Sequence, residues 1–236
     1  LIGTNSMEVF DLFLEMLDQN SARFPENVIN SIGRFGPRAE RAIPVLIRFT
    51  TNDHPRIVGS ALTALSHIGP AAAAAKPRLL EFLDDPDPAM RWRAAWALYK
   101  IDPGETDRAF PHLIAPVRDK TPILSYFHVL AIGEFGPRAH EAVPRLLELL
   151  ESDEWARINS AAALVKIDPS HTDRAVQTLT KMLDDPTILN PHSAATELGR
   201  IGKPAASALP ALKAALKSDH PYLPAAAQKA IEQIRD

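Results

Sequence analysis

One short motif recurs along the chain at an almost constant spacing. An aliphatic residue or phenylalanine is followed by glycine or aspartate and then by proline, and successive copies are 32 to 34 residues apart. The copies are Phe35-Gly36-Pro37, Ile68-Gly69-Pro70, Ile101-Asp102-Pro103, Phe135-Gly136-Pro137, Ile167-Asp168-Pro169 and Ile201-Gly202, the last with its proline delayed to Pro204. A fixed period of this length indicates a repeat architecture, in which each copy forms one small structural unit.

The prolines follow the same period. The chain has 21 prolines, and scattered prolines would break long helices because each removes a backbone donor and clashes with the preceding turn. A second proline follows most copies of the motif by eight or nine residues, at Pro44, Pro77, Pro111, Pro144 and Pro210, and only the fifth unit differs, with Val176. Proline fits the first turn of a helix. We therefore predict that each of these prolines begins the first helix of a repeat.

A second helix is expected after the acidic turn of each repeat. In the segment 89–101 the apolar residues Met90, Ala94, Leu98 and Ile101 recur with helical periodicity. The motif glycines should end these helices in the left-handed conformation, a role that Asp102 and Asp168 would fill less favourably. Thr106 and Thr172 are the expected N-caps of the helices that follow them.

The second-helix sequence resembles a known repeat family. Asp87-Pro88-Ala89-Met90-Arg91, followed by Ala94-Ala95 and Ala97-Leu98, is similar to HEAT repeats, in particular the short bacterial kind named after phycobilisome lyases. The resemblance covers residues 7–236, although the second-helix arginine appears clearly only at Arg91 and Arg157. Short helix pairs bury their apolar stripes by stacking on one another. We predict an all-α fold, a right-handed α-solenoid of about seven two-helix HEAT-like repeats with a period of 32–34.

The same pattern sets the expected domain organisation. We predict a single solenoid domain over residues 7–236, with residues 1–6 as the tail of a preceding unit or as added residues. Because the chain begins with Leu1 rather than methionine, we expect it to be one region of a larger protein. The N-terminal helix predicted over 8–17 is rich in phenylalanine and leucine, so we expect it to contact further chain or to mediate self-association.

Composition excludes several function classes. The net charge is −3 and the pI about 6.3, which gives no electrostatic reason to expect a nucleic-acid partner. There are no cysteines, and so no disulfides or thiolate metal sites. No apolar run approaches 18 residues, so we predict no membrane span.

No catalytic or metal-binding pattern is present. The eight histidines are scattered among the repeats, without a His-Glu-x-x-His motif. HEAT-like deoxyhypusine hydroxylases hold two irons with several His-Glu pairs, and this sequence has only one, His140-Glu141. We predict no catalytic residues, no metal and no cofactor, and thus that this region is not an enzyme.

The strongest candidate for a binding surface lies on the second helices. Opposite the apolar stripe of the third repeat lie Trp92, Trp96 and Tyr99, and corresponding positions in the next two repeats include Tyr126, Leu130 and Ile158, with Arg93 at the edge. In HEAT solenoids the second helices line the concave surface, so the resemblance implies an aromatic and apolar patch there. Tryptophan and tyrosine are typical interface anchors. The alternative is that these side chains pack between neighbouring helices.

Three functions follow from these observations. The leading hypothesis is a non-catalytic scaffold that binds a protein or peptide on its concave face. The resemblance also implies an alternative, a bilin-lyase-like protein that handles a tetrapyrrole chromophore. HEAT-like nucleic-acid binding is the third and is disfavoured by the charge.

Overall fold

Every regular element in the described residues of the computed structural model, 7–120 and 124–236, is a helix. The predicted tail, residues 1–6, lies outside them. The helices pair in sequence into seven two-helix repeats, so the predicted all-α solenoid is confirmed. The chain divides into two compact units, Leu1–Leu113 and Ile114–Asp236, and each is described by itself.

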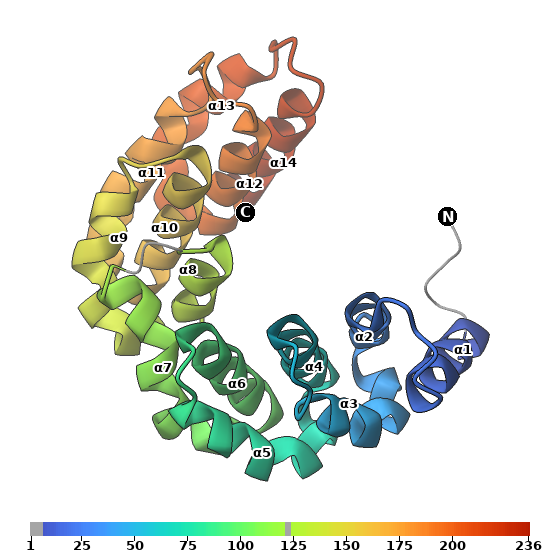
Figure 1. Cartoon of the computed structure of the whole chain (residues 1–236). Helices are drawn as coiled ribbons and strands as arrows, with labels where there is room; N and C mark the ends of the chain where they lie inside the picture. Colours follow the sequence, from blue (N-terminus) through green and yellow to red (C-terminus); the bar gives the residue numbers. More distant parts are fainter. Residues whose placement is uncertain (1–6, 121–123) are drawn as a thin grey trace. The chain divides into compact units, whose positions relative to one another are not determined.

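Unit 1 contains the first three repeats. Its second helices pack side by side, α2 against α4 and α4 against α6, with the first helices forming the other layer (Figure 1). The first helices are α1 (Met7–Asp18), α3 (Ile43–Phe49) and α5 (Lys76–Glu81), and the second helices are α2 (Pro25–Gly33), α4 (Pro55–Ile68) and α6 (Pro88–Ile101). A seventh helix, α7 (Thr106–Arg118), runs across the boundary between the units.

Unit 2 repeats the arrangement. Its second helices also form a packed series, α8 against α10, α10 against α12 and α12 against α14. They are α8 (Tyr126–Gly133), α10 (Glu154–Ile167), α12 (Pro191–Ile201) and α14 (Leu223–Arg235), and the first helices are α9 (Val143–Leu149), α11 (Thr172–Lys181) and α13 (Leu209–Ala215). In both units the interior consists mainly of aliphatic and alanine side chains, and unit 1 also buries phenylalanines such as Phe10 and Phe49.

All four motif glycines have the predicted positive φ. Only Gly69 and Gly202 directly end second helices, because α2 and α8 already end at Gly33 and Gly133. The φ angles of Gly36, Gly69, Gly136 and Gly202 are 58°, 74°, 52° and 72°, a region that side chains with a Cβ rarely occupy. At Gly69 the nearest atom to an added Cβ would be 3.8 Å away. The left-handed backbone, rather than lack of space, therefore explains the glycine at that position.

The two motif aspartates behave differently from the prediction. Asp102 and Asp168 have extended backbones, with φ of −143° in both. Their Oδ1 atoms accept hydrogen bonds from the N–H groups two residues later, at 2.9 and 3.1 Å. They therefore cap the short 3₁₀ helices Pro103–Glu105 and Pro169–His171. The N-cap prediction for Thr106 and Thr172 is wrong, because both are already helical and donate to Pro103 and Pro169 carbonyls instead.

The early helix starts at Thr106 and Thr172 also explain why the second proline of the pattern fails in the two aspartate repeats. Pro44, Pro77, Pro144 and Pro210 occupy the first turns of α3, α5, α9 and α13, as predicted. Pro111, in contrast, lies inside α7, because this repeat begins its first helix at Thr106. In the other aspartate repeat α11 begins at Thr172, so Val176 also occupies an interior position. A helix-starting proline has no role there.

One helical stretch contradicts the expectation from apolar runs. The segment Pro55–Asp84 is long and apolar enough to cross a membrane by length and composition, with a mean hydropathy of 1.3 in its most apolar 18-residue window. It is not one straight helix, because Gly69 reverses the backbone between α4 and the 3₁₀ helix Gly69–Ala75. At 14 residues, α4 is shorter than the roughly 20 that a span needs. The segment is mostly buried, 56% of its most apolar window, as expected for core helices.

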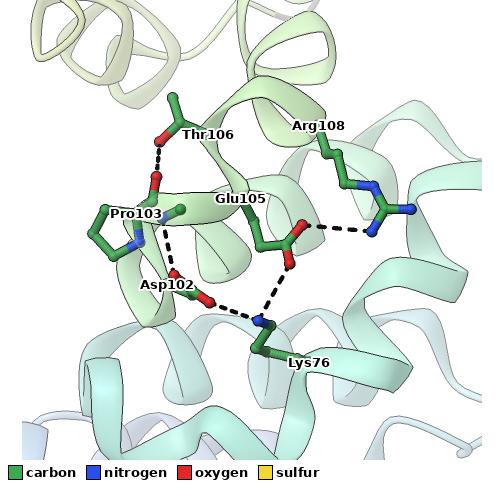
Figure 2. Close-up of polar contacts among 7 residues, drawn as sticks. Lys76, Asp102, Pro103, Glu105, Thr106 and Arg108 are labelled. Carbon is green, nitrogen blue, oxygen red and sulfur yellow. Dashed lines mark hydrogen bonds and ion pairs between the residues drawn. The ribbon is translucent and has the colours of Figure 1, made fainter.

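An ion-pair network joins the third repeat to the turn that leads into α7. Lys76 at the start of α5 lies 2.6 Å from Asp102 and 3.2 Å from Glu105, and Arg108 approaches Glu105 at 3.5 Å (Figure 2). The lysine lowers the pKa of Asp102, and the two carboxylates raise the pKa of Lys76. The aspartate that replaces glycine thus caps its own turn with one oxygen and contacts the preceding repeat with the other.

Candidate partner-binding surfaces

The predicted aromatic residues of unit 1 form a ladder along α6. The Trp92 and Trp96 rings are stacked, with centroids 5.9 Å apart and planes within 11°. The Tyr99 ring lies 5.7 Å from that of Trp96, and the Lys100 ammonium lies 4.4 Å from the Trp96 ring centre. All four side chains are half-buried. The ladder is therefore partly accessible to solvent and partly packed against the protein, with the indole nitrogen of Trp92 buried.

The basic residue predicted at the edge of this surface lies against the neighbouring helix. A Cβ added to Gly59 of α4 would be 3.2 Å from Nε of Arg93, so the arginine covers a gap that the glycine leaves. Its Nη1 also approaches the carbonyl oxygen of Ala89 at 3.3 Å. Arg93 and Lys100 place two positive charges beside the aromatic ladder.

The candidates in unit 2 have different environments. Leu130 on α8 is 43% exposed. Ile158 on α10 is only 5% exposed, so the expectation that it faces a partner is corrected. Its position lies where neighbouring second helices pack, and its side chain belongs to the core. The Tyr126 side chain lies outside the described part of the chain.

The structure shows a set of exposed apolar residues that the sequence analysis missed. Trp155, Leu189 and Tyr222 lie at the N-terminal ends of the second helices of three consecutive repeats, and they are 56%, 79% and 65% exposed. They occupy the same register position, each twelve residues before the last isoleucine of its helix, Ile167, Ile201 or Ile234. Aligning the repeats at that turn, as was done for the helix faces, would have identified them.

The histidines do not form a metal site. No group of three or more histidine, aspartate or glutamate side chains in residues 7–120 and 124–236 could hold a metal ion. His140 contacts Asp168, with Nε2 3.3 Å from Oδ2. Burial lowers the pKa of His67, and burial together with the charge of Arg91 lowers that of His112.

Comparison with known proteins supports the fold. The sequence matches no protein-family profile and no curated protein. Among solved structures, the complex of CpcE and CpcF of phycocyanin lyase from Nostoc sp. matches with a TM-score of 0.57 and 21% identity, covering 95% of this chain and 94% of that one. An engineered protein matches with a TM-score of 0.50 and 20% identity, covering 95% and 68%. This chain is a HEAT-like, armadillo-like α-solenoid.

Human deoxyhypusine hydroxylase also matches, over 94% of this chain and 83% of that one, with 19% identity. Its TM-score is 0.41, so the likeness carries no functional argument. At identities near 20% these likenesses establish the helical-repeat fold alone, and the function has to be argued from the surfaces of this chain.

Proposed function

We propose that this chain is a non-catalytic scaffold that binds a protein partner through the second-helix face of unit 1. The observation that carries the proposal is the ladder of Trp92, Trp96 and Tyr99, with Lys100 against it. Aromatic side chains held rigidly by stacking lose little entropy on binding and are frequent interface anchors. The short bacterial HEAT type named after phycobilisome lyases is the proposed subclass of the repeats.

The charges beside the ladder favour an acidic partner segment. Lys100 lies against the Trp96 ring and Arg93 is on the same helix, against α4. Complementary charge increases the association rate and selects the correct partner. We therefore expect the bound segment to combine apolar anchors with aspartate or glutamate.

Affinity capture from the source lysate tests the proposal, with the wild-type chain and two variants as baits. Arg93→Glu/Lys100→Glu reverses the charges without removing a ring, and Trp96→Ala removes the centre of the ladder. A partner held by the wild type should be lost from the charge-reversal variant, provided that circular dichroism shows that this variant is folded. Equal capture of the same protein by the folded charge-reversal variant contradicts the proposed surface.

The same variants separate this proposal from chromophore handling. A tetrapyrrole bound to the ladder would change its visible absorbance on mixing with the chain, and the change would disappear with Trp96→Ala. Such a result, without a protein partner, would replace the scaffold by a bilin-handling function.

Self-association through α1 is a second part of the partner proposal. Leu12 of this helix is 55% exposed, whereas Phe10 and Leu17 are fully buried. If α1 forms an interface, Leu12→Ser should convert an oligomer to a monomer in sedimentation velocity, and an unchanged sedimentation coefficient contradicts it.

A further inference from the structure

Trp155, Leu189 and Tyr222, here named the turn row, form a second exposed surface. They belong to α10, to the turn before α12 and to the N-terminus of α14, all within unit 2. Scattered single apolar residues are normal on a protein surface. Three large apolar side chains at the same register position of consecutive repeats, each more than half exposed, are not a random scatter.

Hydrogen bonds tie the three turns together. The Glu154 carboxylate, next to Trp155, accepts hydrogen bonds from the backbone N–H groups of Leu189 and Asn190, at 3.0 and 2.8 Å. The carbonyl oxygen of Leu189 lies 3.3 Å from Nε2 of His220 in the next repeat. Each turn is thus bonded to its neighbour, and the row is held in order.

Ring contacts fix the far end of the row. The His192 and His220 rings stack, with centroids 5.6 Å apart, and Tyr222 lies 5.5 Å from His192. The Tyr222 N–H approaches Nδ1 of His220 at 3.4 Å. The tyrosine ring is therefore oriented by its neighbours although 65% of the residue is exposed.

The surroundings of the row are acidic. The turns 151–155, 184–190 and 217–222 carry six carboxylates and Lys217, while Arg157 and Arg174 contact the first turn at Ser152 and Glu151. The carboxylates are Glu151, Asp153, Glu154, Asp184, Asp185 and Asp219. Hydrogen bonds from the Thr187 hydroxyl and backbone N–H lower the pKa of Asp185, which favours its charged form. A bound segment therefore meets aromatic and aliphatic surface within a negative field.

We propose that the turn row binds an extended peptide segment with lysine or arginine at about every third residue. Packed helices are about 8–10 Å apart, and an extended chain rises about 3.3 Å per residue, so each repeat corresponds to roughly three peptide residues. A guanidinium or ammonium group can lie over the Trp155 or Tyr222 ring, while the carboxylates of the turns complement its charge. This proposal does not depend on the α6 ladder, which has positive charges beside it.

Fluorescence anisotropy with three labelled twelve-residue peptides tests the proposal. The first has the sequence Arg-Ala-Ser repeated four times, the second has glutamate in place of arginine, and the third has the composition of the first with its four arginines consecutive. We expect the first peptide to bind at least tenfold more tightly than the second and several-fold more tightly than the third.

Two variants locate the binding. The double variant Trp155→Ser/Tyr222→Ser changes only residues that are more than half exposed, so it should fold, and it should bind the first peptide at least tenfold more weakly. The matched control Phe127→Ser removes an aromatic residue that is 56% exposed, like Trp155, from α8 of the same unit, and it should bind the first peptide within twofold of the wild type.

Three results would overturn the proposal. The first is equal affinity for the arginine and glutamate peptides, and the second is unchanged affinity in the double variant. The third is a wild-type dimer that the double variant converts to a monomer in sedimentation velocity without any peptide binding, because the row would then be occupied by a second copy. None of these results bears on Arg93 and Lys100, whose variants test the scaffold separately.

Discussion

The two units share one backbone plan but place their large exposed side chains differently. Where unit 2 has Trp155, Leu189 and Tyr222, the equivalent positions of unit 1 are Arg23, Arg56 and Ala89. Unit 1 has an exposed aromatic residue before a second helix, Phe24, one position after Arg23, and a half-buried aromatic ladder along α6. In a solenoid each repeat contacts mainly its neighbours, so positions outside these contacts can change without altering the fold. The repeat determines the position of each side chain on the helices. The residues that differ between repeats determine the chemistry of the exposed surface of each unit.

The largest expected effect comes from the closest helix contact. A Cβ added to Gly199 of α12 would be 2.9 Å from Cα of Ala230 in α14, and backbone atoms cannot move aside cheaply. Gly199→Val should therefore lower the free energy of unfolding of unit 2 by about 3 kcal/mol. The register equivalent of Gly199 in unit 1 is Gly33, where a Cβ would also be close to backbone, 3.0 Å from Cα of Ala64.

Gly59 of α4, at another register position, gives a mild contrast, because a Cβ there would meet only the flexible Arg93 side chain. Urea unfolding followed by circular dichroism measures both changes. Gly59→Ala should be neutral or stabilising by up to about 1 kcal/mol, since alanine favours a helix interior over glycine. Similar destabilisation by the two substitutions would contradict the difference in packing between the α4–α6 and α12–α14 contacts.

The next largest effect is expected at Trp96 in the α6 ladder, which we compare with Trp155 in the turn row. Trp96→Ala removes a half-buried ring that contacts Trp92, Tyr99 and Lys100, and we expect a loss of about 2 kcal/mol, roughly half the cost of truncating a fully buried tryptophan. Trp155→Ala should cost less than about 0.5 kcal/mol, because this side chain is 56% exposed. Thermal or urea unfolding of both variants provides the measurement. A Trp155→Ala loss as large as that of Trp96→Ala would show that Trp155 stabilises the fold of unit 2, contrary to its assignment to a partner-binding surface.

The repeat fold could be predicted from the sequence because its markers are local. The left-handed backbone at Gly36, Gly69, Gly136 and Gly202 follows from one residue type at one position. The helix-starting prolines were equally predictable wherever glycine precedes them. Pro111 failed because Asp102 replaces glycine, adopts an extended backbone and shifts the start of α7. Because aspartate replaces glycine at position 102, Pro111, nine residues later, lies inside a helix instead of beginning one.

The candidate surfaces were harder to predict because exposure depends on neighbouring repeats. Periodicity places Ile158 and Leu130 on corresponding helix faces, yet the first is buried and the second exposed. The turn row is invisible to an analysis of helix periodicity, because its residues lie at the beginnings of the helices. Its order depends on contacts between repeats, such as the bond from Leu189 N–H to Glu154, 35 residues earlier in the chain.

The smallest expected effect concerns the side-chain contacts of Asp102 and Asp168 with basic residues, here called joints. In unit 1 the partner of Asp102 is Lys76, at 2.6 Å. Because the pKa of Asp102 is lowered, its contribution is complete above the ordinary carboxyl value of about 3.9 and is lost as the pH falls through the lowered value. Because the pKa of Lys76 is raised, the lysine contribution is complete below about 10.4 and is lost only as the pH rises through the raised value. The joint should therefore be independent of pH between about 5 and 9.

In unit 2 the corresponding partners are imidazoles. Asp168 Oδ2 lies 3.3 Å from His140 and 3.7 Å from His171, and a histidine attracts a carboxylate as a cation only when it is protonated. The pKa of Asp168 is lowered mainly by the hydroxyl and backbone N–H of Ser170, which favours its charged form. Melting curves at pH 5.5 and 8.5 should show Lys76→Met lowering the Tm by about 1–2 °C at both values. His140→Gln should lower it by about 1 °C or less, and only at pH 5.5. Equal effects of His140→Gln at the two pH values would mean that this side chain supports the joint by packing rather than by charge.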